Sequence, residues 1–220
     1  MPGSAIVLHT VVTEEITLFV RPMTRVGPRD GEIAPALLDA CRLGDRDALR
    51  ALYEAYCDRV YSIAFYFFRG DAAAANDVTQ QVFLKLIDGM GKYRGDSAFS
   101  TWLYRIVVNA CVDRSRRWRA ETSIEPAVLD EIPAPTMSHE ELLARGEQAR
   151  SIRDAIATLP ARLRLPILLR YFDDLSYAEM AVALNCSIGT VSSRLSRGHR
   201  LLARRLGPLV GRGGEEVMKK

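Results

Sequence analysis

Apolar residues recur at steps of three and four along most of the chain, and this spacing restricts the fold more than any other feature of the sequence. One amphipathic helix accounts for the apolar stripe over residues 49–64. A second helix follows the turn at residues 69–71 and ends at the glycines of residues 89–91. A third carries a buried stripe over residues 99–110 and ends in a basic run. The first half of the chain therefore predicts a helical domain.

Helical spacing resumes at Ile152 and is interrupted by two prolines. Pro160 suits a first helical turn, whereas Pro166 lies inside the pattern and should kink or restart the helix near Arg162. No strand-rich stretch follows residues 16–20, where apolar residues alternate. The sequence predicts an all-α fold of two helical domains joined by a flexible linker.

Composition shifts along the chain suggest where these domains begin and end. Residues 1–30 form a mixed leader that we expect to be disordered, and residues 31–119 the first domain. Residues 120–145 combine prolines with acidic residues, which is typical of an extended linker. Residues 146–206 form the second domain, and residues 207–220 are expected to be a frayed tail.

The charge and cysteine content exclude several classes of protein. The net charge of the 220 residues is only +3, so the distribution of basic residues must decide whether the chain binds nucleic acid. Its four cysteines lie far apart, without the spacing of a zinc site or a disulfide framework. The apolar stretch over residues 5–20 is interrupted by His9, Glu14 and Glu15, so it fits neither a signal peptide nor a membrane span. We expect a cytoplasmic protein with reduced thiols, no metal and no cofactor.

Two short helices near the C-terminus carry the signs of a helix-turn-helix. Ser176 and Glu179 have the spacing of a capping box, which marks a helix start, and Ser187 can cap a new helix that begins at Ile188. The face expected to point inward comprises Ile188, Val191, Leu195 and Leu202. The opposite face, which would enter the major groove, comprises Thr190, Ser193, Arg194 and Arg197.

A dense basic run continues along this last helix. Residues 194–205 contain five arginines and His199 without any acid, which favours contacts to phosphates and guanines. The alternative is that the positive charge only complements the helix dipole. Cys186, in the turn, is either a small structural thiol or a redox switch.

Aromatic and basic residues also crowd the third helix. Rings provide stacking faces for bases and arginines neutralise phosphates, a combination that holds single-stranded nucleic acid. The alternative is that Trp102 and Tyr104 belong to the core. The candidate residues are Trp102, Arg105, Asn109, Asp113, Arg114, Arg116 and Arg117.

Several ordered motifs resemble those of bacterial RNA polymerase sigma factors. They are the segments at residues 76–83, 99–106 and 109–117, and in the second domain those at 168–172 and 175–181. Because only two domains and a linker are present, the chain is similar to the small extracytoplasmic-function (ECF) type. The likeness extends over about residues 36–206.

The resemblance implies roles for both domains as a transcription initiation factor. The third helix, with the loop at residues 92–100, would recognise and open the minus-10 promoter element, and the helix from Ile188 would read the minus-35 element. The linker would run toward the RNA exit path, and an anti-sigma factor is an expected partner beside core RNA polymerase and promoter DNA. Family members commonly carry acids where Asn76 and Gln81 stand. The expected polymerase-binding residues are Asp77, Gln80, Gln81 and Phe83.

Two other functions remain open at this stage, and an enzyme is not expected. The three histidines are scattered, and the chain contains no HExxH, GxSxG or GxxxxGK[ST] motif. A one-component repressor or activator would use the same helix-turn-helix but needs a dimer interface or a ligand pocket. An adaptor would bind only protein through the first domain.

Overall fold

The computed structural model is helical in both of the ranges it describes, residues 33–122 and 150–217. No strand occurs within those ranges, and the predicted all-α fold with two helical domains is confirmed. The predicted leader at residues 1–30 and residues 123–145 of the predicted linker lie outside the described residues, whereas residues 120–122 of that linker are helical.

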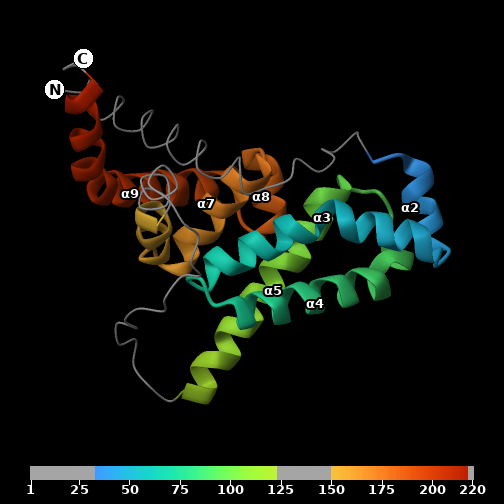
Figure 1. The fold of residues 1–220 in the computed structure, drawn as a ribbon. Helices are drawn as coiled ribbons and strands as arrows, with labels where there is room; N and C mark the ends of the chain where they lie inside the picture. The colour runs from blue at the N-terminus through green and yellow to red at the C-terminus, as the bar shows by residue number, and fades with distance from the viewer. Residues whose placement is uncertain (1–32, 123–149, 218–220) are drawn as a thin grey trace.

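The N-terminal module consists of long helices that lie side by side (Figure 1). Asp45 and Asp71 cap two of them, since their carboxylates accept the amide N–H of Ala48 at 2.8 Å and of Ala74 at 2.9 Å. Gly70 makes the intervening turn at a φ of +93°, as expected for glycine. The elements are α2 (Pro35–Arg42), α3 (Arg46–Phe67), α4 (Ala72–Gly89), the 3-10 turn η2 (Met90–Lys92) and α5 (Phe99–Thr122).

The C-terminal module is built from shorter helices and one long one. A helix over residues 150–157 ends before Pro160, and the next helix starts directly after that proline, so the interruption predicted at Pro160 is confirmed. Pro166 lies inside this second helix without ending it. The elements after residues 150–157 are α7 (Ala161–Asp173), α8 (Tyr177–Ala183) and α9 (Ile188–Val217).

The last helix continues past the point where a frayed tail was predicted. That tail was expected to begin at Gly207, but α9 extends to Val217. Extending an existing helix requires ordering only one residue per new hydrogen bond, so an established helix can pass unfavourable residues. Earlier in α9, Gly198 lets the helix approach α7, because a Cβ there would lie 3.1 Å from Ile167.

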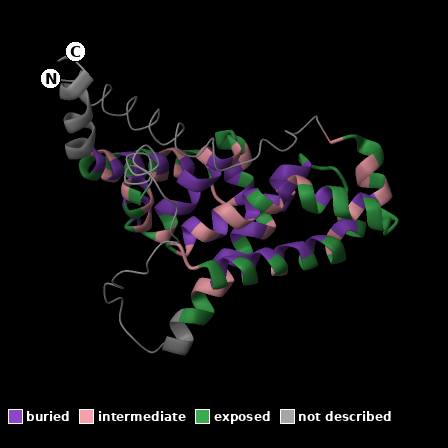
Figure 2. Cartoon of the chain, viewed as in Figure 1, coloured by how far each residue is buried: buried purple, intermediate pink, exposed green. Residues whose placement is uncertain are grey.

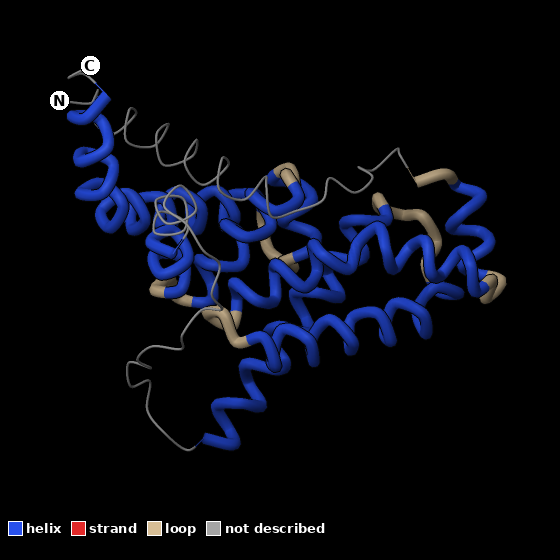
Figure 3. Tube along the Cα trace, viewed as in Figure 1, coloured by secondary structure: helices blue, strands red, loops and turns tan. Residues whose placement is uncertain are grey.

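The two modules pack directly against each other. α3 contacts α7, and α5 contacts α8. Figure 2 shows buried residues concentrated where these helices face one another, and Figure 3 shows that short loops connect the helices within each module. The packing leaves one side of α4, much of α5 and the polar face of α9 exposed, and these are the surfaces available for binding.

Candidate nucleic-acid and polymerase interfaces

Two capped helix starts define the helix-turn-helix. The Ser176 hydroxyl accepts the amide N–H of Glu179 at 3.3 Å, and the Glu179 carboxylate accepts that of Ser176 at 2.7 Å. Asn185 adopts a φ of +48° in the turn, a conformation that asparagine tolerates better than most residues. The Ser187 hydroxyl then accepts the amide N–H of Thr190 at 3.2 Å and starts α9. Both predicted caps are confirmed.

The predicted reading residues share one face at the start of α9. Ser193 and Arg197 are exposed, while Thr190 and Arg194 are half-buried. Successive members of this set are three, one and three residues apart, so the four side chains occupy adjacent positions on one surface of the helix. The guanidinium of Arg194 lies 3.9 Å from the sulfur of Cys186, so the half-buried thiol in the turn contacts a reading residue. This face combines hydroxyls and arginines, which suits groups on DNA bases and phosphates.

Two predictions about α9 are wrong. Ile188 is 53% exposed, because it is the first residue of the helix and precedes the turns that bury Val191 and Leu195. His199 is buried, and its Nε2 lies 3.0 Å from the hydroxyl of Tyr171 on α7, so it does not contribute to the basic surface. The remaining arginines of the run at positions 197, 200, 204 and 205 are exposed.

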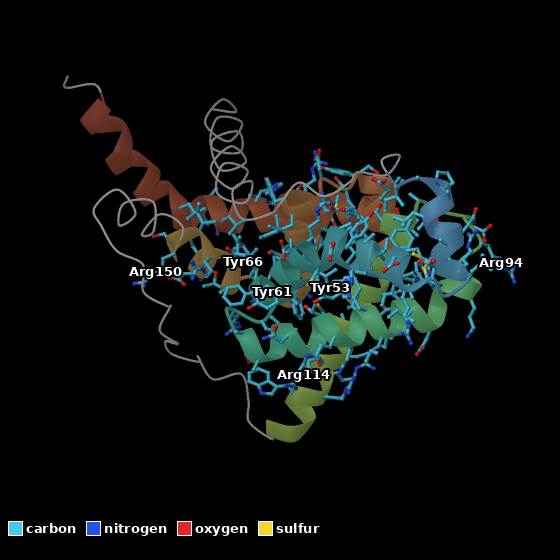
Figure 4. The ribbon with its side chains drawn as sticks, turned by 45° about the vertical axis from the view of Figure 1, so that its right-hand side comes forward. Tyr53, Tyr61, Tyr66, Arg94, Arg114 and Arg150 are labelled. Carbon is cyan, nitrogen blue, oxygen red and sulfur yellow. The ribbon has the colours of Figure 1, made fainter. Side chains whose placement is uncertain are left out.

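A polar stripe runs along the outer side of α5. Positions 102, 105, 109, 113 and 116 follow steps of three and four, so they share a face. Asp113 lies 3.8 Å from Lys85 of α4, which offsets the one negative charge of the stripe. Figure 4 shows Arg114 on this segment of α5. Arg105, Asn109, Arg116 and Arg117 are exposed, whereas Trp102, Asp113 and Arg114 are half-buried.

The aromatic residues of α5 have different environments. Tyr104 is fully buried, so the core interpretation holds for it. The half-buried ring of Trp102 lies 5.2 Å from that of Tyr93 and 5.8 Å from that of Phe99, measured between centroids. A Cβ on Gly89 would lie 3.1 Å from the indole of Trp102. Trp102 therefore packs the loop before α5 against the end of α4.

A distant arginine organises the loop between η2 and α5. The Tyr93 hydroxyl donates to the carbonyl oxygen of Ser97 at 2.7 Å, which closes the loop on itself. Arg42 donates to the carbonyl oxygen of Tyr93 at 2.9 Å, and its guanidinium lies 5.4 Å from the Tyr93 ring centroid. Arg94 and Asp96 remain exposed, and Figure 4 shows Arg94 at the outer end of the molecule. Sequence reasoning missed Arg42, because fifty-one positions separate it from its partner.

The predicted polymerase-binding residues do not all reach the surface of α4. Asp77 and Gln80 are exposed and Gln81 is half-buried. Phe83 is only 7% exposed, and its ring packs 4.7 Å from that of Tyr53 on α3. Phe83 is therefore in the core of the N-terminal module, beneath the exposed residues of α4.

Exposed apolar residues continue this surface of α4. Leu84 is 63% exposed and Ile87 47% exposed, one and two turns beyond Gln80. Tyr53 on α3, whose ring packs on Phe83, is 46% exposed. Steps of three and four residues from Asp77 and Gln80 could have identified Leu84 and Ile87 as surface residues, but Ile87 was assigned to the apolar stripe of the helix. We call Asp77, Gln80, Gln81, Leu84 and Ile87 the α4 surface.

Comparison with protein families accounts for both modules. Residues 52–121 match the model for Sigma-70 region 2, and residues 149–202 match the model for Sigma-70 region 4. The chain is 35% identical over 189 residues to the ECF RNA polymerase sigma-E factor of Escherichia coli, covering 80% of this chain and 95% of the relative. The chain belongs to the ECF sigma factors.

Two further relatives agree. The RNA polymerase sigma-H factor of Pseudomonas aeruginosa is 34% identical over 186 residues, covering 79% of this sigma factor and 94% of the relative. The ECF RNA polymerase sigma factor SigW of Bacillus subtilis is 30% identical over 171 residues, covering 74% of this sigma factor and 91% of the relative. As a sigma factor, the protein recognises promoters for RNA polymerase in transcription initiation, and its family consists of non-enzymatic initiation factors.

Solved structures share the fold. CnrH, in complex with the cytosolic domain of CnrY, matches with a TM-score of 0.58 at 21% identity, covering 79% of this sigma factor and 96% of that chain. The sigma factor RpoE of Bartonella quintana, in complex with the anti-sigma factor NepR, matches with a TM-score of 0.58 at 21% identity. The match covers 72% of this sigma factor and 96% of that chain. Among the described residues, none of the helices is both long and apolar enough to cross a membrane.

Proposed function

We propose that the two modules divide promoter recognition between them. The α5 stripe and the loop at residues 92–100 bind and open the minus-10 element, and the reading face of α9 recognises the minus-35 element. The N-terminal module corresponds to residues 31–119 and the C-terminal module to residues 146–206, joined by residues 120–145. The capped helix-turn-helix, with hydroxyls and arginines on one face, is the observation that carries the assignment.

Neither module alone binds enough of the promoter for accurate selection. Each good bidentate contact to a base contributes about 1 to 3 kcal/mol, and the reading face offers few side chains for such contacts. When polymerase holds both modules, the second engagement becomes intramolecular. Capture of an unstacked base near the loop then offsets an unstacking cost of about a few kcal/mol, so binding rather than nucleotide hydrolysis opens the strands.

The α4 surface docks the factor on the largest subunit of core polymerase, at its clamp. Exposed apolar residues beside polar ones support this role, because an apolar patch with a polar surround is typical of a protein interface. We further propose that the protein acts in the cytoplasm without a cofactor, catalyses no reaction itself, and is held inactive by an anti-sigma factor. The two solved relatives bound to CnrY and to NepR support that partner.

Transcription in vitro with core polymerase tests the proposal. Adding the protein to core enzyme and a pool of random templates should produce accurate initiation at a subset of them. DNA binding that needs no polymerase and blocks transcription would instead identify a repressor. Polymerase binding without any change in start-site usage would identify an adaptor.

A matched pair of arginine variants tests the reading face. Arg194→Ala should reduce use of some minus-35 sequences more than others, because contacts to bases carry sequence information. Arg162→Ala, at an exposed position on α7 outside the helix-turn-helix, should leave promoter choice unchanged. An equal loss across all promoters for Arg194→Ala would reject the assigned role.

A further inference from the structure

The short helix α2 reaches the loop before α5 through one arginine. α2 lies at the end of the molecule away from α9 (Figure 1), and Figure 4 labels Arg94 of the loop at that same end. The guanidinium of Arg42, in the last turn of α2, donates to the carbonyl oxygen of Tyr93 at 2.9 Å and lies 5.4 Å from the centroid of its ring. One side chain therefore contacts both the backbone and the ring of a single loop residue.

The guanidinium of Arg42 is itself oriented by α2. Its other terminal nitrogen donates to the carboxylate of Asp39 at 2.7 Å, one helical turn earlier. The amide N–H of Gly44 closes the end of the helix on the carbonyl oxygen of Cys41 at 3.1 Å, and Cys41 is buried in the core. A planar guanidinium that bonds at both ends has a fixed direction. Arg42 is therefore an oriented donor on an anchored helix end.

The loop depends on Tyr93 for its shape. Residues 93–98 lie in neither a helix nor a strand, and Gly95 adopts a φ of +79°. The hydroxyl of Tyr93 closes the loop on the carbonyl oxygen of Ser97 at 2.7 Å. Its ring packs edge to face on Phe99 at the start of α5, with centroids 5.7 Å apart. Because the hydroxyl, the ring and the carbonyl of Tyr93 all make contacts, displacing this residue changes the shape of the whole loop.

The exposed part of the loop lies next to this residue. Arg94, Gly95 and Asp96 are exposed in succession, whereas Tyr93 and Ser97 on either side are half-buried. The arginine provides hydrogen-bond donors and the aspartate provides acceptors, which are the groups that recognise the edge of an unstacked base. A loop that already has its binding shape loses less conformational freedom when it binds. Discrimination between bases should therefore depend on how firmly Tyr93 is held.

We propose that Arg42 is a positioning residue for recognition of the unstacked minus-10 base: it holds Tyr93, and through Tyr93 the loop at residues 93–97, in the shape that selects one base. This inference rests on the proposed capture of that base near the loop. Arg42 needs no contact with DNA for this role, because its terminal nitrogens already donate to Asp39 and Tyr93. Its loss should reduce discrimination between bases more than it reduces binding to duplex promoter DNA.

Base preference in the holoenzyme tests the proposal. Core polymerase is combined with the full-length wild type or with Arg42→Met, and supplied with templates in which each minus-10 position is randomised. At the position where the wild type discriminates most strongly, Arg42→Met should reduce the preference about fivefold. Preferences at the other positions should be retained. A loss of folded protein alone would lower initiation on all templates by the same factor and leave every preference unchanged.

Three further variants separate the contacts of Arg42. Arg50→Met, at an exposed arginine on α3, is the matched control and should keep the wild-type preference. Arg42→Lys retains the positive charge but lacks the fork that reaches Asp39 and Tyr93 together, so it should restore the preference only in part. Tyr93→Phe retains the ring beside Arg42 and removes the hydroxyl that closes the loop on Ser97. It should relax the preference at the same position as Arg42→Met.

Backbone order in the free full-length chains provides a second measurement. Nuclear magnetic resonance order parameters of residues 93–97 should fall in Arg42→Met and keep their wild-type values in Arg50→Met. If either the order parameters or the base preference of Arg42→Met equal those of the wild type, the positioning role is rejected. An equal loss of preference in Arg50→Met also rejects it. A wild-type holoenzyme that initiates accurately without any base preference in the minus-10 element instead overturns the proposed base capture, and the role of Arg42 with it.

Discussion

The two modules position their binding surfaces in different ways. In the N-terminal module, the α5 stripe and the α4 surface lie along the sides of helices that are 24 and 18 residues long. In the C-terminal module, the reading face begins within one turn of a helix start, directly after the cap at Ser187. A surface along a long helix depends on the core behind it, whereas a surface at a helix end depends on the groups that close that end.

Buried polar groups have different partners in the two modules. In the N-terminal module, Arg59 and three hydroxyl residues (Thr79, Ser100 and Thr101) are the buried polar side chains, in a core built around residues such as Tyr56 and Leu103. The C-terminal module contains Arg164, which is 4% exposed and donates to the carbonyl oxygens of Ile156 and Leu159 at the end of the preceding helix. The Arg164 guanidinium therefore donates to backbone carbonyl oxygens that a longer helix would satisfy with its own N–H groups.

The largest expected effect comes from removing that cation. Arg164 also donates to the carbonyl oxygens of Ala157 and of Phe67 on α3, so Arg164→Met leaves several buried acceptors without a donor. Burial lowers the pKa of Arg164 to about 10, and the side chain stays charged at neutral pH. We expect a loss of about 3 to 5 kcal/mol in unfolding free energy, measured by denaturant titration.

Arg162→Met provides the matched control for this prediction. Arg162 lies two positions earlier on α7 and is exposed. Its replacement should change the unfolding free energy by no more than about 0.5 kcal/mol. Equal losses for the two variants would show that the closed helix end is not what stabilises the C-terminal module.

The next effect separates the core from the docking surface in the N-terminal module. Phe83→Ala removes a buried ring that packs on Tyr53 and should lower the unfolding free energy by about 3 kcal/mol. Leu84→Ala changes a side chain that is 63% exposed and should leave stability within about 0.5 kcal/mol. Only Leu84→Ala should weaken binding to core polymerase without unfolding, as measured by a binding titration.

The opposite result for Leu84→Ala would mean that the α4 surface is not the apolar docking surface. If Leu84→Ala binds core polymerase as tightly as the wild type, α4 does not dock through its apolar residues. A thermal melt of each variant, recorded before the titration, shows whether any loss of binding reflects loss of the fold.

Local signals in the sequence predicted much of this architecture. The capping box at Ser176, the cap at Ser187 and the break at Pro160 each involve groups within a few residues, so spacing alone locates them. Apolar periodicity likewise identified the core stripe of α5, apart from Ile106, which is half-buried. These features are determined by short-range geometry.

Short-range spacing could not predict contacts between segments that are distant in the sequence. Arg42 holds the loop through Tyr93, and His199 meets Tyr171, although nothing in their neighbouring residues indicates these partners. Phe83 illustrates the related difficulty at a candidate site. Its place in a motif suggested docking, and only the packing of α3 on α4 shows that its ring is buried.

A smaller effect concerns a buried thiol in the N-terminal module. Burial raises the pKa of the Cys111 thiol from an ordinary value of 9.0 to about 12. Between those values the unfolded chain releases the thiol proton while the folded chain retains it, so stability falls as the pH rises above about 9. The loss should approach 1.4 kcal/mol per pH unit, or about that amount at pH 10.

Two substitutions separate ionisation from packing at this position. Cys111→Ser and Cys111→Ala differ in size and polarity and should differ in stability at neutral pH. Neither side chain ionises in this range, so both should lose the same alkaline component of the stability profile. If the wild type and both variants share one alkaline slope, Cys111 does not contribute to it.

The smallest expected effect is the loss of one N-cap in each module. It tests the difference between the modules most directly, because equal losses of stability should have unequal effects on transcription initiation. Ser176→Ala and Asp71→Ala each remove one N-cap and should each cost about 1 kcal/mol in unfolding free energy. In α4 the docking residues begin several positions after the Asp71 cap and are supported by the core, so polymerase binding should persist. In the C-terminal module the cap at Ser176 sets the start of α8 and hence the angle at which α9 is presented. Ser176→Ala should therefore lower initiation at promoters that depend on the minus-35 element, while Asp71→Ala should not, and similar initiation by both would show that helix ends do not position the reading face.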